Sequence, residues 1–338
     1  ARDKHWLGGD PTLPRAEAVT RVIFMGSPAF AVPSLRRLVE RGVDVAAVVT
    51  QPDRPAGRGG QVQPPAVKVA ALDLSLTVLQ PEKLRDTSTM NTLRAIAPDA
   101  IVVVAYGKIL RPAVLDLPPL GCLNVHPSLL PKLRGAAPIQ AAIRDGFEST
   151  GVTVMLLNER MDAGPILSQL RAPIFSDDTA ATLGERLANL GADLLVETLP
   201  RWQAGALRPT PQNEAEATYC KPLSKDDANV NWEQPAEVIA RACRAQTPWP
   251  GCQTYWAGKT VRLFDLQPLP GWRGPEAPGT TLLFATAAPP RLAIATASGA
   301  VIVPVLQLAG KRPLPAVEFL RGQPGFVGSQ LGVLPSPP

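Results

Sequence analysis

The segment from Asn124 to His126 carries the side chains of this sequence that are best suited to catalysis. The chain has two histidines, and the other one, His5, lies in a polar N-terminal segment. Because an imidazole titrates near neutral pH, His126 is the credible candidate for proton transfer. Asn124 stands two residues before it. Alternate side chains of an extended strand project to the same face, so we expect the amide and the ring to point into one site.

Asp162 is the third candidate, and it lies in the sequence Met161-Asp162-Ala163-Gly164 just after an expected strand at 152–157. An amide, an imidazole and a carboxylate together suit acyl transfer to an amine. The amide and a protonated imidazole can stabilise the oxyanion, while the carboxylate orients the ring and the leaving nitrogen gains a proton. This chemistry requires no covalent nucleophile. The other interpretation of these residues is a hydrogen-bonded core histidine and a turn at Asp-x-Gly.

A loop rich in Gly and Pro, residues 50–60, contains Arg54 and Arg58. It follows an expected strand at 43–50, and ligands of open α/β sheets bind at the carboxyl ends of strands. With Lys68 beyond it, this loop is expected to close over a phosphate-bearing substrate. A solvated surface loop is the alternative.

Alternating strands and helices are expected to hold these candidates in place. The expected strands are 21–26, 43–50, 76–79, 100–105, 121–126 and 152–157, and the expected helices are 28–41, 88–97, 138–144 and 178–204. This alternation predicts an α/β domain with a mainly parallel sheet. Gly26 ends the first strand without the further glycines of a dinucleotide-binding fingerprint, which argues against NAD.

The pattern changes after Gly205, where the apolar runs become short and are separated by Gly, Pro and Asn. Strands at 253–256 and 260–266, and at 292–296 and 300–306, predict two hairpins of a small β-barrel, with a last helix at 315–321. The expected divisions are an N-terminal extension outside the core at 1–20, the α/β domain at 21–205, a connector at 206–225 and the barrel domain at 226–338.

The charge of the chain permits contact with a polyanion but does not require it. The net charge is +5 and the pI is about 9.2, and many enzymes are equally basic. Basic residues among the short strands of the barrel are expected to form a basic face that an oligonucleotide can contact. These residues are Arg241, Arg244, Lys259, Arg262, Lys311 and Arg312.

The cysteines and the apolar runs indicate the cellular compartment. The four cysteines form no C-x-x-C pair, which predicts buried free thiols and no metal site. No apolar run approaches the ~20 residues of a membrane span, and residues 1–20 lack the apolar core of a signal peptide. We therefore expect a protein of the cytoplasm that does not contact a membrane.

Four motifs of this chain resemble those of the methionyl-tRNA formyltransferase family. They are Gln51 to Gly59, Val103 to Gly107, Asn124 to Pro138 and Met161 to Leu167. The resemblance extends over about residues 21 to 330 and includes Thr218-Tyr219-Cys220-Lys221-Pro222 in the connector. It implies a Rossmann-like formyltransferase domain followed by an OB-like β-barrel that binds tRNA. It also implies 10-formyltetrahydrofolate as the formyl donor and the α-amino group of methionyl initiator tRNA as the acceptor.

The resemblance also assigns roles to residues. It makes Asn124, His126 and Asp162 the catalytic triad. Arg54 lies in the loop that meets the tRNA, and Arg58 matches the arginine placed against its aminoacyl end. The folate-binding strip and the segment whose backbone faces the pterin are matched by Ser128, Leu129, Leu130, Pro131, Val104 and Tyr106. No metal and no obligate protein partner is implied, and we expect a monomer.

Two positions depart from the family pattern, and other functions are compatible with the triad. Pro127 stands where some relatives have glycine, and Leu133 stands where an aromatic residue is frequent, although leucine fills much of the same space. The alternatives are an amino-sugar-nucleotide N-formyltransferase, a 10-formyltetrahydrofolate hydrolase in which water replaces the amine, and a tRNA-binding protein with an inactive catalytic domain. The arginine loop and the barrel domain argue against the first alternative, and the intact triad argues against the last.

Replacement of Arg58 by alanine is expected to impair the use of tRNA and to leave folate binding intact, because the resemblance places this arginine against the aminoacyl end. Initial rates at varied tRNA concentration and an equilibrium titration with folate measure the two effects separately. Weakened folate binding in Arg58→Ala would contradict the assignment.

Overall fold

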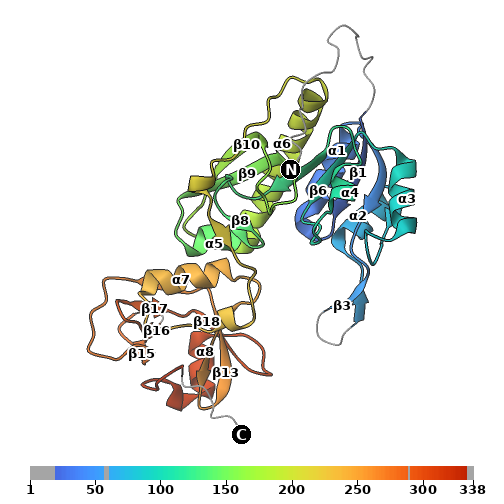
Figure 1. Ribbon diagram of the computed structural model, residues 1–338. Helices are drawn as coiled ribbons and strands as arrows, with labels where there is room; N and C mark the ends of the chain where they lie inside the picture. Colours follow the sequence, from blue (N-terminus) through green and yellow to red (C-terminus); the bar gives the residue numbers. More distant parts are fainter. Residues whose placement is uncertain (1–19, 57–60, 288–289, 333–338) are drawn as a thin grey trace.

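The computed structural model describes residues 20–56, 61–287 and 290–332. An α/β part and a β part follow one another along the chain, and helices α5 (Pro138–Arg144) and α7 (Ala236–Ala245) lie side by side where they meet (Figure 1). Of the expected N-terminal extension, residues 1–20, all but Thr20 lies outside the described residues.

A seven-stranded sheet forms the centre of the α/β part, in the order β10-β9-β7-β6-β1-β2-β5. Strands β5, β2, β1, β6 and β7 are parallel neighbours, β9 pairs antiparallel with β7, and β10 pairs antiparallel with β9. The prediction of a Rossmann-like, mainly parallel sheet is therefore confirmed. The bounds are β1 Arg21–Gly26, β2 Asp44–Val49, β5 Val78–Leu79, β6 Ala100–Val104, β7 Cys122–His126, β9 Ser149–Leu156 and β10 Ile166–Pro173.

Alternate side chains of β1 supply two separate hydrophobic cores, one on each face of the sheet. Val22 and Phe24 pack with residues of α1, α2 and α6, whereas Ile23 and Met25 pack with residues of α3 and α4. Helices on both faces explain why this strand is apolar at almost every position. The bounds are η1 Ala29–Ala31, α1 Val32–Glu40, α2 Ala66–Asp73, α3 Thr87–Ile96, α4 Pro112–Leu115 and α6 Ala180–Gln203.

The elements of the α/β part that were not predicted from the sequence include strand β10, helix α2 and a hairpin in the arginine loop. Strand β10 lies at the edge of the sheet with residues 169–171 exposed, so it lacks a continuous apolar run. Helix α2 begins directly after Pro65, in a segment to which we assigned no element. The arginine loop contains a short hairpin of β3 (Arg54–Ala56) and β4 (Gln61–Gln63), whose strands carry few of the apolar residues that indicate a strand.

The connector docks onto the α/β part. Its strand β11 (Tyr219–Cys220) pairs in parallel with β8 (Arg134–Gly135), and Thr210 exchanges two backbone hydrogen bonds with Ile166 at the start of β10. The short helices η2 (Glu214–Glu216) and η3 (Asp226–Ala228) lie before and after β11. The connector is thus an ordered part of the α/β part and not a free linker between the two parts.

The β part consists of two four-stranded antiparallel sheets, in the orders β12-β13-β18-β19 and β14-β17-β16-β15. This agrees with the predicted OB-like domain. The bounds are β12 Cys252–Trp256, β13 Lys259–Phe264, β14 Gln267–Leu269, β15 Thr281–Phe284, β16 Arg291–Ala295, β17 Ala300–Ile302, β18 Val305–Leu308, β19 Leu314–Pro315, α8 Ala316–Gly322 and η4 Pro324–Phe326.

Helix α7 corrects the expected basic face. Arg241 and Arg244 were expected among short strands, but both lie on this helix. Arg241 donates to the carbonyl of Arg144 at 3.4 Å, and Arg244 donates to the carbonyl of Asp178 at 2.8 Å. These two arginines therefore join the β part to the α/β part.

No helix within the described ranges is long and apolar enough to cross a membrane.

The expectation of four free thiols is wrong for two of the cysteines. Cys243 of α7 and Cys252 of β12 form a disulfide, whereas Cys122 and Cys220 are free and buried, as predicted. The two partners are separated by 9 residues, and a pattern search limited to C-x-x-C motifs does not detect such a pair. The bridge ties α7 to the first sheet of the β part.

Replacement of both Cys243 and Cys252 by alanine is expected to lower the free energy of unfolding of the β part by on the order of 2–3 kcal/mol, because the bridge closes a short loop in the unfolded chain. Urea unfolding followed by circular dichroism measures the change. Reduction of the wild-type chain should lower the same free energy by a similar amount, and titration of four thiols in the unfolded, unreduced chain would contradict the bridge.

Candidate active site

A cavity of about 640 Å³ opens at the carboxyl ends of β6 and β7. Asn124, His126 and Asp162 all line it, together with apolar residues that include Val103 and Ile109. The volume lies in the range of small-molecule sites, and such sites combine apolar walls with a few convergent polar groups. The structure therefore brings together the three residues that the sequence indicated. Among the described residues, no group of three or more His, Cys, Asp or Glu side chains is arranged to hold a metal ion.

Strand β7 delivers the amide and the imidazole. Asn124 is 8% exposed and His126 is 5% exposed, while Val125 between them packs into the core with α6. The strand is held on both sides, because Asn124 lies opposite Val103 of β6 and His126 lies opposite Thr153 of β9. A side chain on a central strand is positioned more rigidly than one on a loop, so the pair is preorganised.

The hydrogen bonds of His126 determine its tautomer. Its Nε2 lies 3.0 Å from the backbone carbonyl of Leu133, and a carbonyl can only accept a hydrogen bond. Nε2 therefore carries the hydrogen, and in the neutral ring Nδ1 holds the free lone pair. The Nδ1 atom lies 3.8 Å from Oδ2 of Asp162. The ring is thus oriented so that Nδ1 can take up a proton and the resulting cation then faces a carboxylate.

Asp162 is held by both its side chain and its backbone. Its Oδ2 accepts a hydrogen bond from the N–H of Gly135 at 2.8 Å, and its carbonyl accepts one from Nε2 of Gln212 at 2.8 Å. Its φ of 48° lies in the left-handed region, where an aspartate needs support from its surroundings. Gly164 allows the loop to turn this closely, since a Cβ there would lie 1.8 Å from the carbonyl oxygen of Leu156.

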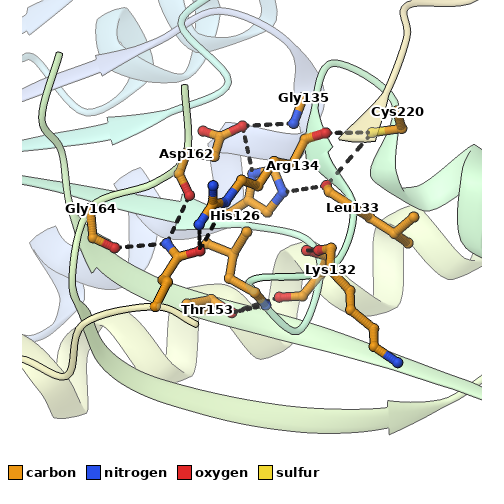
Figure 2. A network of polar contacts seen from close by, with 12 residues as sticks. His126, Lys132, Leu133, Arg134, Gly135, Thr153, Asp162, Gly164 and Cys220 are labelled. Carbon is orange, nitrogen blue, oxygen red and sulfur yellow. Dashed lines mark hydrogen bonds and ion pairs between the residues drawn. The ribbon is translucent and has the colours of Figure 1, made fainter. Parts of the chain in front are cut away.

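A fully buried arginine lies at the centre of the contacts around this site (Figure 2). The guanidinium of Arg134 donates to Oε1 of Gln212 at 2.8 and 3.0 Å, to Glu214 at 2.9 and 3.2 Å and to the hydroxyl of Tyr219 at 3.0 Å. Arg160 donates at 2.6 Å to Oε2 of Glu214, which also accepts from Arg134. These hydrogen bonds, first that of Arg134 and then that of Arg160, lower the pKa of Glu214 from 4.5 to about 2.

Sequence reasoning did not identify Arg134, Gln212 or Glu214. Arg134 stands inside the motif that we quoted, but its partners lie in the connector and no local pattern links the two segments. An arginine in the motif that carries Asn124 and His126 was the available signal, because a buried guanidinium requires partners elsewhere in the chain.

The predicted folate strip does not belong to the wall of the cavity that the described residues form. Ser128, Leu129, Leu130 and Pro131 line no part of it. The Ser128 hydroxyl donates to the carbonyl of Lys132 at 2.6 Å, and Leu130 donates its N–H to Oγ1 of Thr153 at 3.2 Å. These residues shape the turn after β7, and their contact with a folate stays a prediction.

The two other predicted folate contacts lie in β6 and just beyond it. The Val104 side chain is fully buried in the core and does not face the cavity, whereas Tyr106 lines the cavity and is 2% exposed. Burial raises the pKa of Tyr106 to about 12. Tyr106 thus lines the cavity and the Val104 side chain lies in the hydrophobic core, while the contact of this backbone segment with a folate stays a prediction.

The arginine loop lies apart from the triad in the part that the structure describes. Arg54 is exposed on β3 and does not line the cavity, and Arg58 lies outside the described residues. Lys68 forms an ion pair with Asp53 at 2.7 Å. A hydrogen bond from Gln80, followed by that from Lys68, lowers the pKa of Asp53. Lys68 therefore binds a carboxylate at the base of the loop. The sequence instead predicts that it contacts a phosphate of the substrate.

The two departures from the family pattern fit the structure. Leu133 is 4% exposed and packs with Ala141, Ala142 and Cys220, and its carbonyl oxygen accepts the hydrogen bond from Nε2 of His126. Pro127 lines the cavity next to His126. A leucine at position 133 thus fills the apolar space beside the site, as predicted.

Both the sequence and the fold of this chain resemble those of known proteins. The family model described as "Formyl transferase" matches residues 20–199, and the model "Formyl transferase, C-terminal domain" matches residues 222–324. A methionyl-tRNA formyltransferase of Roseiflexus sp. strain RS-1 is 47% identical over 313 residues, which are 92% of this chain and 95% of that protein. That of Chloroflexus aurantiacus strain J-10-fl is 45% identical over 302 residues, which are 89% of this chain and 96% of the relative.

Solved structures share the fold at lower identity. HypX from Aquifex aeolicus in complex with tetrahydrofolic acid has a TM-score of 0.62 and 21% identity, and the match covers 92% of this chain and 48% of that one. This chain therefore spans about half the length of HypX. An N-formyltransferase from Helicobacter canadensis, solved with folinic acid and dTDP-3-aminofucose, has a TM-score of 0.60 and 17% identity, with coverages of 84% and 98%.

Replacement of Glu214 by glutamine is expected to destabilise the fold most above about pH 4.5. A carboxyl whose folded pKa is about 2 and whose ordinary pKa is 4.5 stabilises the fold above pH 4.5, and this contribution disappears as the pH falls through 2. The difference in unfolding free energy between wild type and Glu214→Gln should therefore shrink over that interval. Denaturant unfolding at several pH values measures it.

Glu216 offers a matched control in the same short helix, since its carboxylate accepts a hydrogen bond from Asn213 in place of an arginine. Glu216→Gln should change the stability less than Glu214→Gln does, because it alters a hydrogen bond from an amide and not an ion pair. A pH-independent difference between wild type and Glu214→Gln would contradict the ion pair with Arg134.

Proposed function

This chain belongs to the formyl transferase family, and we propose that it transfers the formyl group of 10-formyltetrahydrofolate to the α-amino group of methionyl initiator tRNA. Relatives at 45–47% identity that match nearly their whole length support this acceptor. The observation that carries the mechanism is the geometry of His126, whose Nε2 meets the Leu133 carbonyl while Nδ1 faces Asp162. The amino-sugar alternative has no comparable support, because the N-formyltransferase solved with dTDP-3-aminofucose is 17% identical to this chain, which shows a shared fold alone. The relatives at 45–47% identity are likewise not hydrolases by name.

The cavity fits a formyl donor of the folate class. Its wall is largely apolar near Val103 and Tyr106, which suits a flat ring, and its polar groups gather at Asn124, His126 and Asp162. When bound, the donor supplies an activated formyl group on nitrogen. We propose that the side chain of Tyr106 and the backbone of residues 103–107 hold the ring, and that Ser128 to Pro131, in the turn after β7, bind the folate as the resemblance implies.

His126 performs the proton transfer in this proposal. The free lone pair of Nδ1 takes a proton from the α-amino nitrogen as that nitrogen bonds to the formyl carbon. Asp162 stabilises the imidazolium that results, at the distance of 3.8 Å seen between Nδ1 and Oδ2. His126 then returns the proton to the donor nitrogen as its bond to the formyl carbon breaks, so the ring ends each turnover neutral.

Asn124 stabilises the charge that develops on the formyl oxygen. Its amide lies on the same strand face as His126 and lines the cavity. An amide N–H that is already aimed at the oxyanion needs no reorganisation during the reaction, which is why such donors strongly lower the barrier. The buried strand β7 provides this rigidity.

The tRNA is proposed to contact Arg54 and Arg58 in the loop and the basic residues of the β part. We propose that residues 21–205 carry out catalysis, that residues 206–225 form the connector and that residues 226–338 bind the tRNA. We propose that the protein acts as a monomer in the cytoplasm, where its tRNA acceptor occurs. The disulfide between Cys243 and Cys252 is unusual for a protein of the cytoplasm, where thiols are kept reduced.

Incubation of the chain with 10-formyltetrahydrofolate and methionyl initiator tRNA should yield formylmethionine that depends on both substrates, identified by mass spectrometry after deacylation. His126→Ala is expected to lower the rate by about 10²- to 10⁴-fold because the proton relay is lost. Asn124→Ala is expected to lower it by about 10²- to 10³-fold because an oxyanion donor is lost.

Both variants should keep the wild-type circular dichroism, since each removes a side chain that faces the cavity. Parallel reactions with a dTDP-amino sugar, and with no acceptor, test sugar formylation and formate release. Absence of formylmethionine with the wild-type chain would sink the proposed function, and near-normal turnover in both variants would sink the assigned roles.

A further inference from the structure

The connector contacts the two segments that support His126 and Asp162. On one side, Thr218 and Cys220 exchange backbone hydrogen bonds with the segment 131–136. On the other side, Thr210 pairs with Ile166, at the end of the loop that carries Asp162. The connector thus lies between the support of His126 and the support of Asp162, although it is remote from both in sequence.

Gln212 joins these two sides through one amide group. Its Oε1 accepts hydrogen bonds from Nε and Nη2 of Arg134. Its Nε2 donates to the carbonyls of Asp162 at 2.8 Å and Gly164 at 2.7 Å. A guanidinium cannot accept a hydrogen bond and a carbonyl cannot donate one. Arg134 therefore fixes which way the amide points, and a flipped amide would be mismatched at all four contacts.

Three consecutive residues connect this arrangement to the chemistry (Figure 2). The carbonyl of Leu133 meets His126, the side chain of Arg134 holds the connector, and the N–H of Gly135 holds the carboxylate of Asp162. Displacement of the connector would therefore move the imidazole and the carboxylate relative to one another.

We propose that Gln212, oriented by Arg134, is a positioning residue that holds Asp162 in its left-handed conformation and so sets the rate of proton transfer. This inference rests on the proposed function. Asp162 interacts strongly with the ring only once the ring is charged, so its misplacement lowers kcat and leaves ground-state binding unchanged. A small displacement of a catalytic group can lower the rate by about 10²-fold, even when the mutated residue takes no part in the chemistry.

Gln212→Glu and Gln212→Ala separate positioning from stability. The glutamate keeps the shape and its contact with Arg134 but turns two donors into an oxygen that repels the carbonyls of Asp162 and Gly164. We expect it to be at least as stable as the alanine variant and no more active, with kcat about 10- to 100-fold below wild type. KM for each substrate should stay at the wild-type value in both variants.

Gln246→Ala is the matched control, because Gln246 also donates its amide to a backbone carbonyl, that of Asp227, in the β part and away from the cavity. It should lower the stability and leave kcat unchanged. If Gln212→Glu fails to fold, the comparison of Gln212→Ala with Gln246→Ala decides the question.

The proposal is overturned if kcat follows stability across the three variants, if kcat keeps its wild-type value in the Gln212 variants, or if KM rises while kcat is kept. A wild-type chain that transfers no formyl group would overturn the proposed function. A wild-type chain and Gln212 variants of equal activity would overturn only the positioning role.

Discussion

The burial of one guanidinium governs how this site is built. Arg134 has no exposed surface, so its charge and its five N–H donors need partners inside the protein. Those partners come from Gln212, Glu214 and Tyr219, all in the connector. Removal of one partner of a buried charge costs far more than the net contribution of the pair, so the connector and the segment around Arg134 are held together. The catalytic geometry depends on this pairing.

The sheet contributes the other half of the geometry, by a different physical route. Asn124 and His126 are fixed by backbone pairing on both sides of β7 and by Val125 packing beneath them. Asp162 lies on a loop and has no such ladder, so hydrogen bonds from Gly135 and Gln212 hold it instead. Two members of the triad thus depend on a hydrophobic core, and the third depends on polar contacts.

Local patterns predicted the parts of this molecule that depend on local physics. Apolar runs and their breaks identified β1, β6, β7 and α6, and the two-residue period placed Asn124 and His126 on one face. Strand β10, the pairing of β8 with β11 and the partners of Arg134 are determined by contacts between residues far apart in the chain, which no periodicity records. The bridge between Cys243 and Cys252 likewise depends on how α7 meets β12.

The parallel pairing of β8 with β11 also bears on the order of events during synthesis. A chain emerging from the ribosome can form the seven-stranded sheet and α6 once residue 203 is available, because the buried core residues on both faces lie before that point, with the exception of Ala245. The strand that completes the support of the site, Tyr219–Cys220, emerges later. A nascent chain therefore acquires a folded sheet before it acquires an ordered active site.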